Sequence, residues 1–247
     1  MKNRGQVTIF IIIAILIVAA VALFFTLRGG VEKEKTLSPE IVPIKNFVQE
    51  CLEETTKEGV YFIGLQGGYY DVPEDFVKIS YYSVPIHFYK NRANIPNVDL
   101  FQKELGFYIE QNFEECIYNF SSLNLSNTKI SAGEPEVKVS VSDDVKVDLI
   151  YPLVIEVDES KTLLNEFESF SDFDFNYVYN ILEEFKEEQV KNPDYVITGK
   201  LLDLAAENNF TYETWYLSDN VVIYSLKLNM IGMKEPYIFS LGAKYDW

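Results

Sequence analysis

Residues 137–147 read VKVSVSDDVKV, and this alternation of valine with polar residues predicts two β-strands joined by a tight turn at Asp143 and Asp144. Side chains of a strand point alternately to its two faces, so the pattern places the valines on one buried face. Pro152 follows within the return strand and predicts a sheet edge or a bulge, because proline cannot donate to the sheet ladder. The middle of the chain is therefore expected to form a β-hairpin.

Apolar residues recur at helical spacing on both sides of this hairpin. We expect one helix from Pro43 to a C-cap at Gly59, a second that opens at Asp99 and carries its apolar face to Phe120, and a third from Thr162 to about Val190. Residues 63–89 are expected to form turns plus one or two short strands. Further strands are predicted at residues 210–217, 221–228 and 237–244. Because helices and strands do not alternate as βαβ units, the predicted class is α+β, with helices and an antiparallel sheet.

The composition indicates a folded domain of about 205 residues after a short linker at residues 29–42. Hydrophobic residues make up 48% of the chain and aromatic residues 15%, which excludes a disordered chain. We expect one domain over residues 43–247, with a division into a helical part (43–133) and a sheet-containing part (134–247).

Residues 8–27 read TIFIIIAILIVAAVALFFTL and contain no charged residue. A helix of this length spans roughly 30 Å, the thickness of the hydrocarbon core of a bilayer. The apolar core of a cleaved secretory signal is shorter, roughly 7–15 residues, and ends at a small-residue cleavage site. The sequence therefore predicts that residues 1–28 form a short basic leader and a single transmembrane helix in contact with membrane lipid.

Charge predicts the orientation of this helix. Lys2 and Arg4 precede the apolar run and Arg28 follows it, so the positive-inside rule favours a cytoplasmic N-terminus. From Gly29 onward, the remaining 18 basic residues against 38 acidic ones give a formal charge of −20. Such a domain would be repelled by an anionic inner leaflet and by nucleic acid. We therefore expect the domain to lie outside the cell membrane and to have no nucleic-acid partner.

The leader Lys2-Asn-Arg-Gly-Gln-Val-Thr8 is very short and basic, and its Gly5-Gln6 pair leads directly into the apolar run. In this it resembles the class III signal of archaeal type IV pilin-like and archaellin-like proteins. The resemblance covers about the first thirty residues. It implies that a prepilin peptidase cuts beside Gly5, and that the helix then packs into a filament core or stays as a membrane anchor. Phe10 stands where the family has a glutamate that helps to set subunit register. An ordinary signal anchor with an incidental Gly-Gln is the alternative.

Cys51 and Cys116 lie on the apolar faces of two predicted helices. An even number of cysteines in an exterior compartment favours a disulfide. Two buried free thiols are the alternative. A zinc site is not expected, since His87 is the only histidine and no CxxC motif exists.

Three sequons mark candidate glycosylation sites at Asn119, Asn124 and Asn209. The first two fall in the polar stretch 119–129, which suits a surface loop. These sites predict a glycoprotein only where the host glycosylates its surface proteins.

Other motifs do not predict a catalytic, metal or cofactor site. Asp172, Asp174 and Asn176 have the spacing of calcium ligands, but Tyr177 occupies the position of the sharp-turn glycine, so a helix start is the preferred interpretation. The acidic run around Glu183 and Glu184 is interpreted as a solvated helix face.

Two short segments, Ser126-Asn-Thr-Lys129 and Ser218-Asp-Asn220, match two of the three motifs of serine penicillin-binding proteins and β-lactamases. The third motif, Lys-Thr-Gly, is absent, so the sequence does not predict such an enzyme. The glycines around Gly67 and Gly68 lack a phosphate-binding motif, although a loop rich in glycine and tyrosine suits a ligand pocket.

The expected function is that of a membrane-anchored extracytoplasmic structural or adhesive surface protein that self-assembles or contacts a cell-surface partner, without catalysis. A tethered domain that binds a small molecule or a partner is the second hypothesis, and an enzyme is the third.

Overall fold

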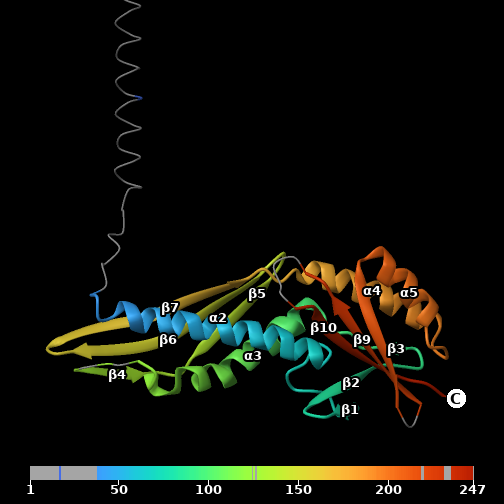
Figure 1. The fold of residues 1–247 in the computed structure, drawn as a ribbon, viewed down its shortest axis with the longest axis horizontal. Helices are drawn as coiled ribbons and strands as arrows, with labels where there is room; N and C mark the ends of the chain where they lie inside the picture. Colours follow the sequence, from blue (N-terminus) through green and yellow to red (C-terminus); the bar gives the residue numbers. More distant parts are fainter. Residues whose placement is uncertain are drawn as a thin grey trace, which may run out of the picture. The chain divides into compact units, whose positions relative to one another are not determined.

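The computed structural model describes residue 17 and residues 38–123, 125, 127–217, 220–230 and 235–246, with the side chain of Asn119 excepted. Residues Pro39–Trp247 form one compact unit (Figure 1). Its helices are α2 (Val42–Leu65), α3 (Val98–Ile117), the short 3₁₀ turn η1 (Tyr118–Phe120), α4 (Phe175–Lys191) and α5 (Thr198–Glu207). Its strands are β1 (Phe76–Ile79), β2 (Tyr82–Tyr89), β3 (Arg92–Ala93), β4 (Thr128–Ala132), β5 (Glu136–Val141), β6 (Val145–Val157), β7 (Ser160–Ser171), β8 (Phe210–Tyr216), β9 (Val221–Leu228) and β10 (Tyr237–Lys244). The predicted α+β class is confirmed.

The predicted hairpin is part of a four-stranded antiparallel sheet, with its second strand, β6, at the centre. Strand β6 pairs with β7 along one side, and with β5 and then β4 along the other. Pro152 lies where the partner changes from β5 to β4, and the register with β7 shifts between Ile150 and Leu153. A residue without an N–H is tolerated there because no ladder bond is required of it. The predicted bulge at Pro152 is confirmed.

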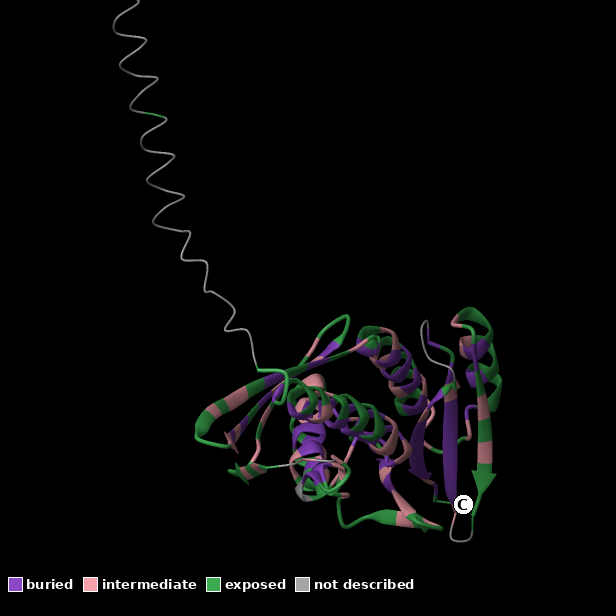
Figure 2. Cartoon of the chain, turned by 60° about the vertical axis from the view of Figure 1, so that its left-hand side comes forward, coloured by how far each residue is buried: buried purple, intermediate pink, exposed green. Residues whose placement is uncertain are grey.

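Helices α2 and α3 cover one face of this sheet. Alternate residues of β6 from Val145 to Ile155 are buried, as the valine pattern predicted. The two helices run antiparallel, since Cys51 meets Cys116 and Gly59 meets Tyr108. Figure 2 shows the buried residues gathered between the helices and the sheets.

Polar side chains of these helices also cover the edges of the sheet. The amide of Val141 on β5 donates to Oε1 of Gln102 on α3 at 2.9 Å, and the amide of Val137 donates to Oε1 of Glu110 at 3.2 Å. On the opposite edge, Gln49 of α2 donates to the carbonyl oxygen of Glu168 on β7. Exposed edge strands are sites of unwanted pairing, and here the helices occupy the free backbone groups.

A second sheet of six strands has the order β1-β2-β10-β9-β8, with β3 paired to β2. Strands β2 and β10 are parallel, so the expectation of purely antiparallel sheets is wrong at this pair. Because β2 comes from residues 82–89 and β10 from residues 237–244, the predicted parts 43–133 and 134–247 share one sheet. Helices α4 and α5 lie side by side beside this sheet (Figure 1).

The boundaries of two predicted helices need correction. Residues 160–171 form strand β7, not the first half of a helix, and α4 begins only at Phe175. The apolar residues Leu163, Leu164, Phe167 and Phe170 are spaced as on a helix, and pairing with β6 overrides this local pattern. Helix α2 continues past Gly59 to Leu65, because Gly59 is an interior position packed against Tyr108.

Among the described residues, no helix combines the length and the apolar character that crossing a bilayer requires. The predicted transmembrane segment at residues 8–27 lies outside the described residues, except for Ile17.

Candidate functional site

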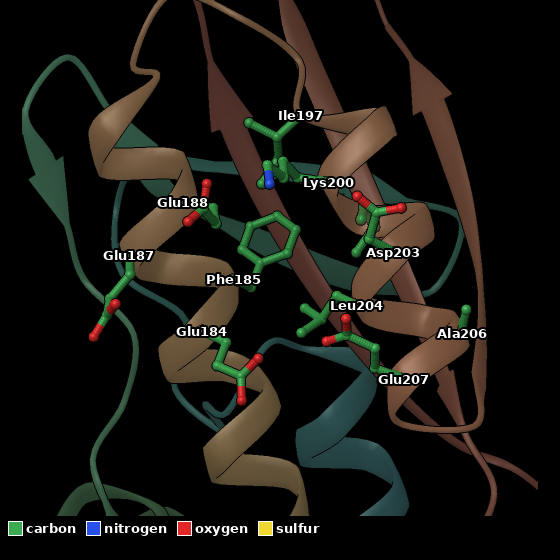
Figure 3. A pocket seen from close by; sticks show the side chains of 11 residues that line it. Glu184, Phe185, Glu187, Glu188, Ile197, Lys200, Asp203, Leu204, Ala206 and Glu207 are labelled. Carbon is green, nitrogen blue, oxygen red and sulfur yellow. The ribbon is translucent and has the colours of Figure 1, made fainter.

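A groove runs between α4 and α5 and encloses about 440 Å³ (Figure 3). Phe185 of α4 and Leu204 of α5 lie between the two helices, with Ile197 at the start of α5. Phe185 is fully buried because it also packs on Phe88 of β2 and Tyr224 of β9. The floor of the groove is therefore apolar and fixed by the core.

Carboxylates line both walls of this groove. Those on α4 belong to Glu184, Glu187 and Glu188, and those on α5 to Asp203 and Glu207. Lys200 is the one cation among the lining residues (Figure 3). The sequence did not predict that these carboxylates lie together, because helix α5 was not predicted. The acidic wall on α4 was interpreted as a solvated face.

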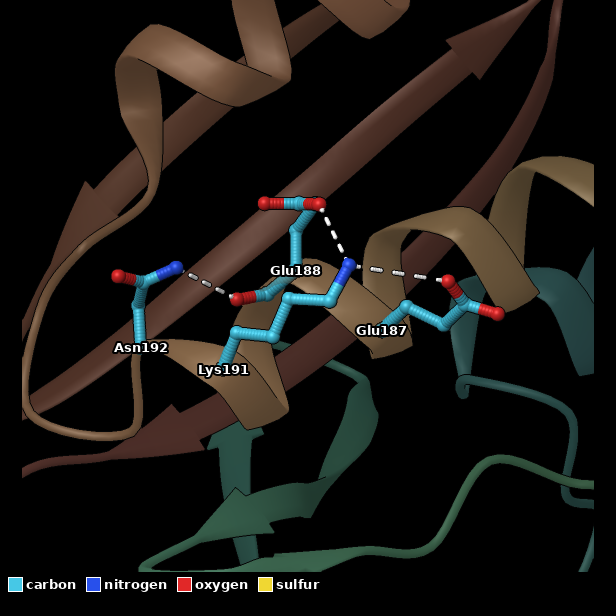
Figure 4. A network of polar contacts seen from close by, with 4 residues as sticks. All are labelled: Glu187, Glu188, Lys191 and Asn192. Atoms are coloured by element: carbon cyan, nitrogen blue, oxygen red, sulfur yellow. Dashed lines mark hydrogen bonds and ion pairs between the residues drawn. The ribbon is translucent and has the colours of Figure 1, made fainter.

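One lysine neutralises part of the α4 wall. Lys191 Nζ lies 3.0 Å from Glu188 Oε1 and 3.8 Å from Glu187 Oε2 (Figure 4). The hydrogen bond to Glu188 raises the pKa of Lys191 above its ordinary value. Glu184, Asp203 and Glu207 form no ion pair within the part of the chain that the structure describes. The groove thus keeps a negative charge, and the described residues hold no group of His, Cys, Asp or Glu suited to a metal ion.

A buried polar network anchors α4 beneath the groove. Tyr245 OH donates to Gln189 Oε1 at 2.9 Å, and Tyr224 OH lies 2.6 Å from Tyr245 OH. Burial raises the pKa of Tyr245 to about 12 and raises the pKa of Tyr224 as well. Both hydroxyls therefore stay protonated, and the network joins α4 to the sheet without acid–base chemistry.

The only histidine is also a structural residue. His87 is 1% exposed, its Nε2 donates to the carbonyl oxygen of Gly67 at 2.9 Å, and its Nδ1 accepts from the amide of Gly242 at 3.2 Å. These two bonds require the neutral ring. Burial lowers the pKa of His87 from 6.5 to about 4. The interpretation of His87 as a packed residue rather than a catalytic base fits this geometry.

The glycine-rich segment at the C-terminal end of α2 is packed against protein. A side chain at Gly64 would collide with Tyr237 and the backbone of Ile238, and one at Gly67 would collide with His87. Gly67 and Gly68 also have positive φ angles of 65° and 95°. These glycines permit close packing rather than the approach of a ligand. A hollow of about 570 Å³ does lie next to this segment, lined by Tyr69, His87 and Arg92 among others.

A third depression, which we name the aromatic hollow, lies between α2 and the end of β7. It measures about 850 Å³. Four aromatic side chains line it, namely those of Tyr61, Phe62, Tyr108 and Phe170. Phe170 falls in the segment from Thr162 to about Val190 that was predicted to be a helix, but it lies on strand β7 and is 60% exposed. Because the helical spacing was the wrong period for this segment, the sequence did not indicate this surface.

Cys51 and Cys116 are at disulfide distance, as predicted. Their Cα atoms are 5.6 Å apart, and the bond joins α2 to the end of α3. Cys51 is 1% exposed, so the link lies within the helix interface.

The remaining predicted sites fall in several places. Asn209 is exposed at the turn between α5 and β8. Asn119 lies in η1 with no described side chain, and Asn124, Gly5 and Gln6 lie outside the described residues. Asp174 accepts from the amide of Tyr177 at 2.9 Å, so it caps α4, as the helix-start interpretation implies.

Comparison of the chain with protein-family models, with curated proteins and with solved structures finds no match in any of the three.

Proposed function

We propose that this chain is a membrane-anchored extracytoplasmic surface protein with a structural or adhesive role and no catalytic activity. The first thirty residues would supply a pilin-like leader and the anchor, and the folded unit from Pro39 would be presented outside, for self-assembly or contact with a cell-surface partner. The observation that carries this proposal is the Cys51–Cys116 pair.

The pair supports an exterior location through its chemistry. Disulfides persist in oxidising compartments and are rare where thiols are kept reduced. The bond would close a loop of 65 residues and join two helices that carry much of the core. A chain-entropy estimate for such a loop is about 4 kcal/mol of added stability, which suits a domain exposed to the environment.

The absence of catalysis is proposed from the state of the groups that usually perform it. His87 is neutral and both of its nitrogens are engaged. The buried tyrosines Tyr224 and Tyr245 have raised pKa values and bond to one another. Groups that serve acid–base catalysis usually have pKa values near the working pH.

A tethered binding domain is the second candidate. The observation that favours it is the aromatic hollow, whose lining combines exposed aromatic surface with carboxylates. A surface protein could contact its partner through this hollow, so the adhesive role and the binding role are compatible.

The proposal is tested on native membranes isolated in the presence of an alkylating reagent. Peptide mapping without reduction should recover Cys51 and Cys116 as one cross-linked pair, with little alkylation of either. Quantitative alkylation of both thiols under native conditions would remove the main support for the exterior location. N-terminal sequencing of the same material tests the leader, since cleavage beside Gly5 should remove Met1.

A further inference from the structure

We propose that the aromatic hollow binds an alkylammonium cation, such as a lysine side chain or a small quaternary amine. The hollow is formed by the C-terminal half of α2, by Tyr108 of α3, and by residues 170–172 at the end of β7. Its lining supplies both features that such a cation requires, aromatic faces and negative charge.

The aromatic wall is built by helix packing. The rings of Phe62 and Tyr108 lie 5.5 Å apart, and Tyr70 meets Tyr108 edge to face at 5.6 Å. Gly59, one turn before Phe62, lets Tyr108 approach α2, because a side chain there would lie 2.6 Å from the Tyr108 ring. The contact is therefore fixed by the core and not by a mobile loop.

Phe170 completes the hollow from the sheet side. Its ring is 60% exposed, and Lys146 Nζ already lies 5.7 Å from its centroid. This ring therefore makes one cation–π contact within the protein itself. Exposed cation–π contacts are worth roughly a two- to fivefold change in affinity each.

Carboxylates surround the aromatic surface. The acidic residues of the lining are Glu54, Glu58, Asp172 and Glu235, and Lys57 is its one cation. None of these four carboxylates forms an ion pair with any residue that the structure describes. Glu58 lies near enough to raise the pKa of Tyr108, after the larger effect of burial. The negative field thus reaches the aromatic wall.

This combination distinguishes the aromatic hollow from the α4–α5 groove. Both are acidic, but the aromatic residue of the groove, Phe185, is fully buried and presents no ring face to a ligand. An anionic ligand would be repelled at either place. An alkylammonium cation binds more tightly where aromatic ring faces and carboxylates lie together. Of these two sites, only the aromatic hollow offers both.

The test uses full-length protein in detergent at physiological ionic strength, with calorimetry or ligand-detected NMR as the readout. The probes are tetramethylammonium chloride and the peptide Gly-Gly-Lys-Gly-Gly. The neutral control is 3,3-dimethyl-1-butanol, which has the shape of a quaternary amine without its charge. Saturable binding of at least one cationic probe, and none of the neutral alcohol, is expected. Binding of the peptide alone would identify a side chain of a partner as the natural ligand, and binding of tetramethylammonium alone would identify a free small amine.

Variants locate the site. Phe170→Leu should weaken binding about two- to fivefold with little effect on folding, since the ring is largely exposed. Glu58→Gln combined with Asp172→Asn should weaken it further. The matched control, Glu184→Gln with Glu207→Gln in the α4–α5 groove, removes the same charge and should change affinity less than about twofold, because distant charges are screened.

Four results would overturn the proposal: no saturable binding of either cation, equal binding of the neutral alcohol, equal losses in the two double variants, or an unchanged affinity in Phe170→Leu. Lys57→Gln gives an independent check. It removes a like charge from the lining and should tighten binding, so weaker binding of the cation would also contradict the proposal.

Discussion

Acidification below about pH 6.5 should destabilise the protein through its single histidine. His87 is fully buried, and its neutral ring donates to Gly67 and accepts from Gly242. Protonation would place a second donor on Nδ1, facing the Gly242 amide, so the bond would be replaced by repulsion. The folded protein therefore resists protonation, and burial lowers the pKa of His87 from 6.5 to about 4.

The sign and size of the effect come from proton linkage. Between pH 6.5 and about 4, the unfolded chain binds a proton at His87 and the folded chain does not. Stability therefore falls with falling pH by about 1.4 kcal/mol per unit, and by about 3 kcal/mol over the whole interval. Above pH 6.5 both states are neutral and the contribution is constant. Below about pH 4 both are protonated and no more stability is lost through this group.

Two assays measure this effect. Because the chain has one histidine, its ring protons give a single NMR titration in the folded protein. Denaturant unfolding at several pH values, in the wild type and in His87→Gln, gives the slope. Titrating carboxylates contribute to both proteins, so the difference between the two slopes isolates His87. An ordinary pKa near 6.5 in the folded state, or equal slopes in the two proteins, would refute the reasoning.

Cys51→Ser should lower the free energy of unfolding by about 4 kcal/mol, which is the chain-entropy estimate for a 65-residue loop. In a denaturant titration the reduced wild type should show the same loss, and a loss below about 1 kcal/mol would contradict the pairing. Gly64→Ala should cost about 1–3 kcal/mol, because its Cβ would lie 2.5 Å from the carbonyl oxygen of Ile238. Gly199→Ala, with no atom within 4 Å, should be neutral or stabilise by up to about 1 kcal/mol, and equal effects of the two would contradict the packing. Gln102→Ala should speed hydrogen exchange at the Val141 amide and lower the free energy of unfolding by about 0.5–1.5 kcal/mol, because that amide loses its acceptor. Unchanged exchange would show that the Gln102 side chain does not protect this sheet edge.

The sequence predicted best where the local pattern and the tertiary structure agree. In the valine alternation of residues 137–147 the valines are buried in β6 and half-buried in β5, and Pro152 lies at a change of partner. Strands β9 and β10 have the predicted bounds, because their apolar runs are flanked by turn residues. Their length of eight residues is also typical of strands and short for a helix.

Prediction failed where long-range strand pairing overrides the local pattern. In residues 160–171 the apolar positions suit a helix, but the segment pairs with β6 over its whole length. The parallel pairing of β2 with β10 joins residues about 150 positions apart, and no local signal reports such a contact. Helix α5 was missed because it is short and buries only Leu201 and Ala205 among its residues.

The candidate sites show the same division. The cysteine pair was predictable, since both residues lie on apolar helix faces that pack together. The aromatic hollow was not, because it depends on placing Phe170 on an exposed strand face opposite α2. Its carboxylates come from three separate segments, so only the fold brings them together.

The exterior location of the domain is tested most directly by adding protease to intact cells and following peptides from residues 39–247 by mass spectrometry. If the domain is outside, these peptides should be released from intact cells while a cytoplasmic marker stays uncut. Protection of the domain in intact cells, with digestion only after lysis, would reverse the proposed orientation.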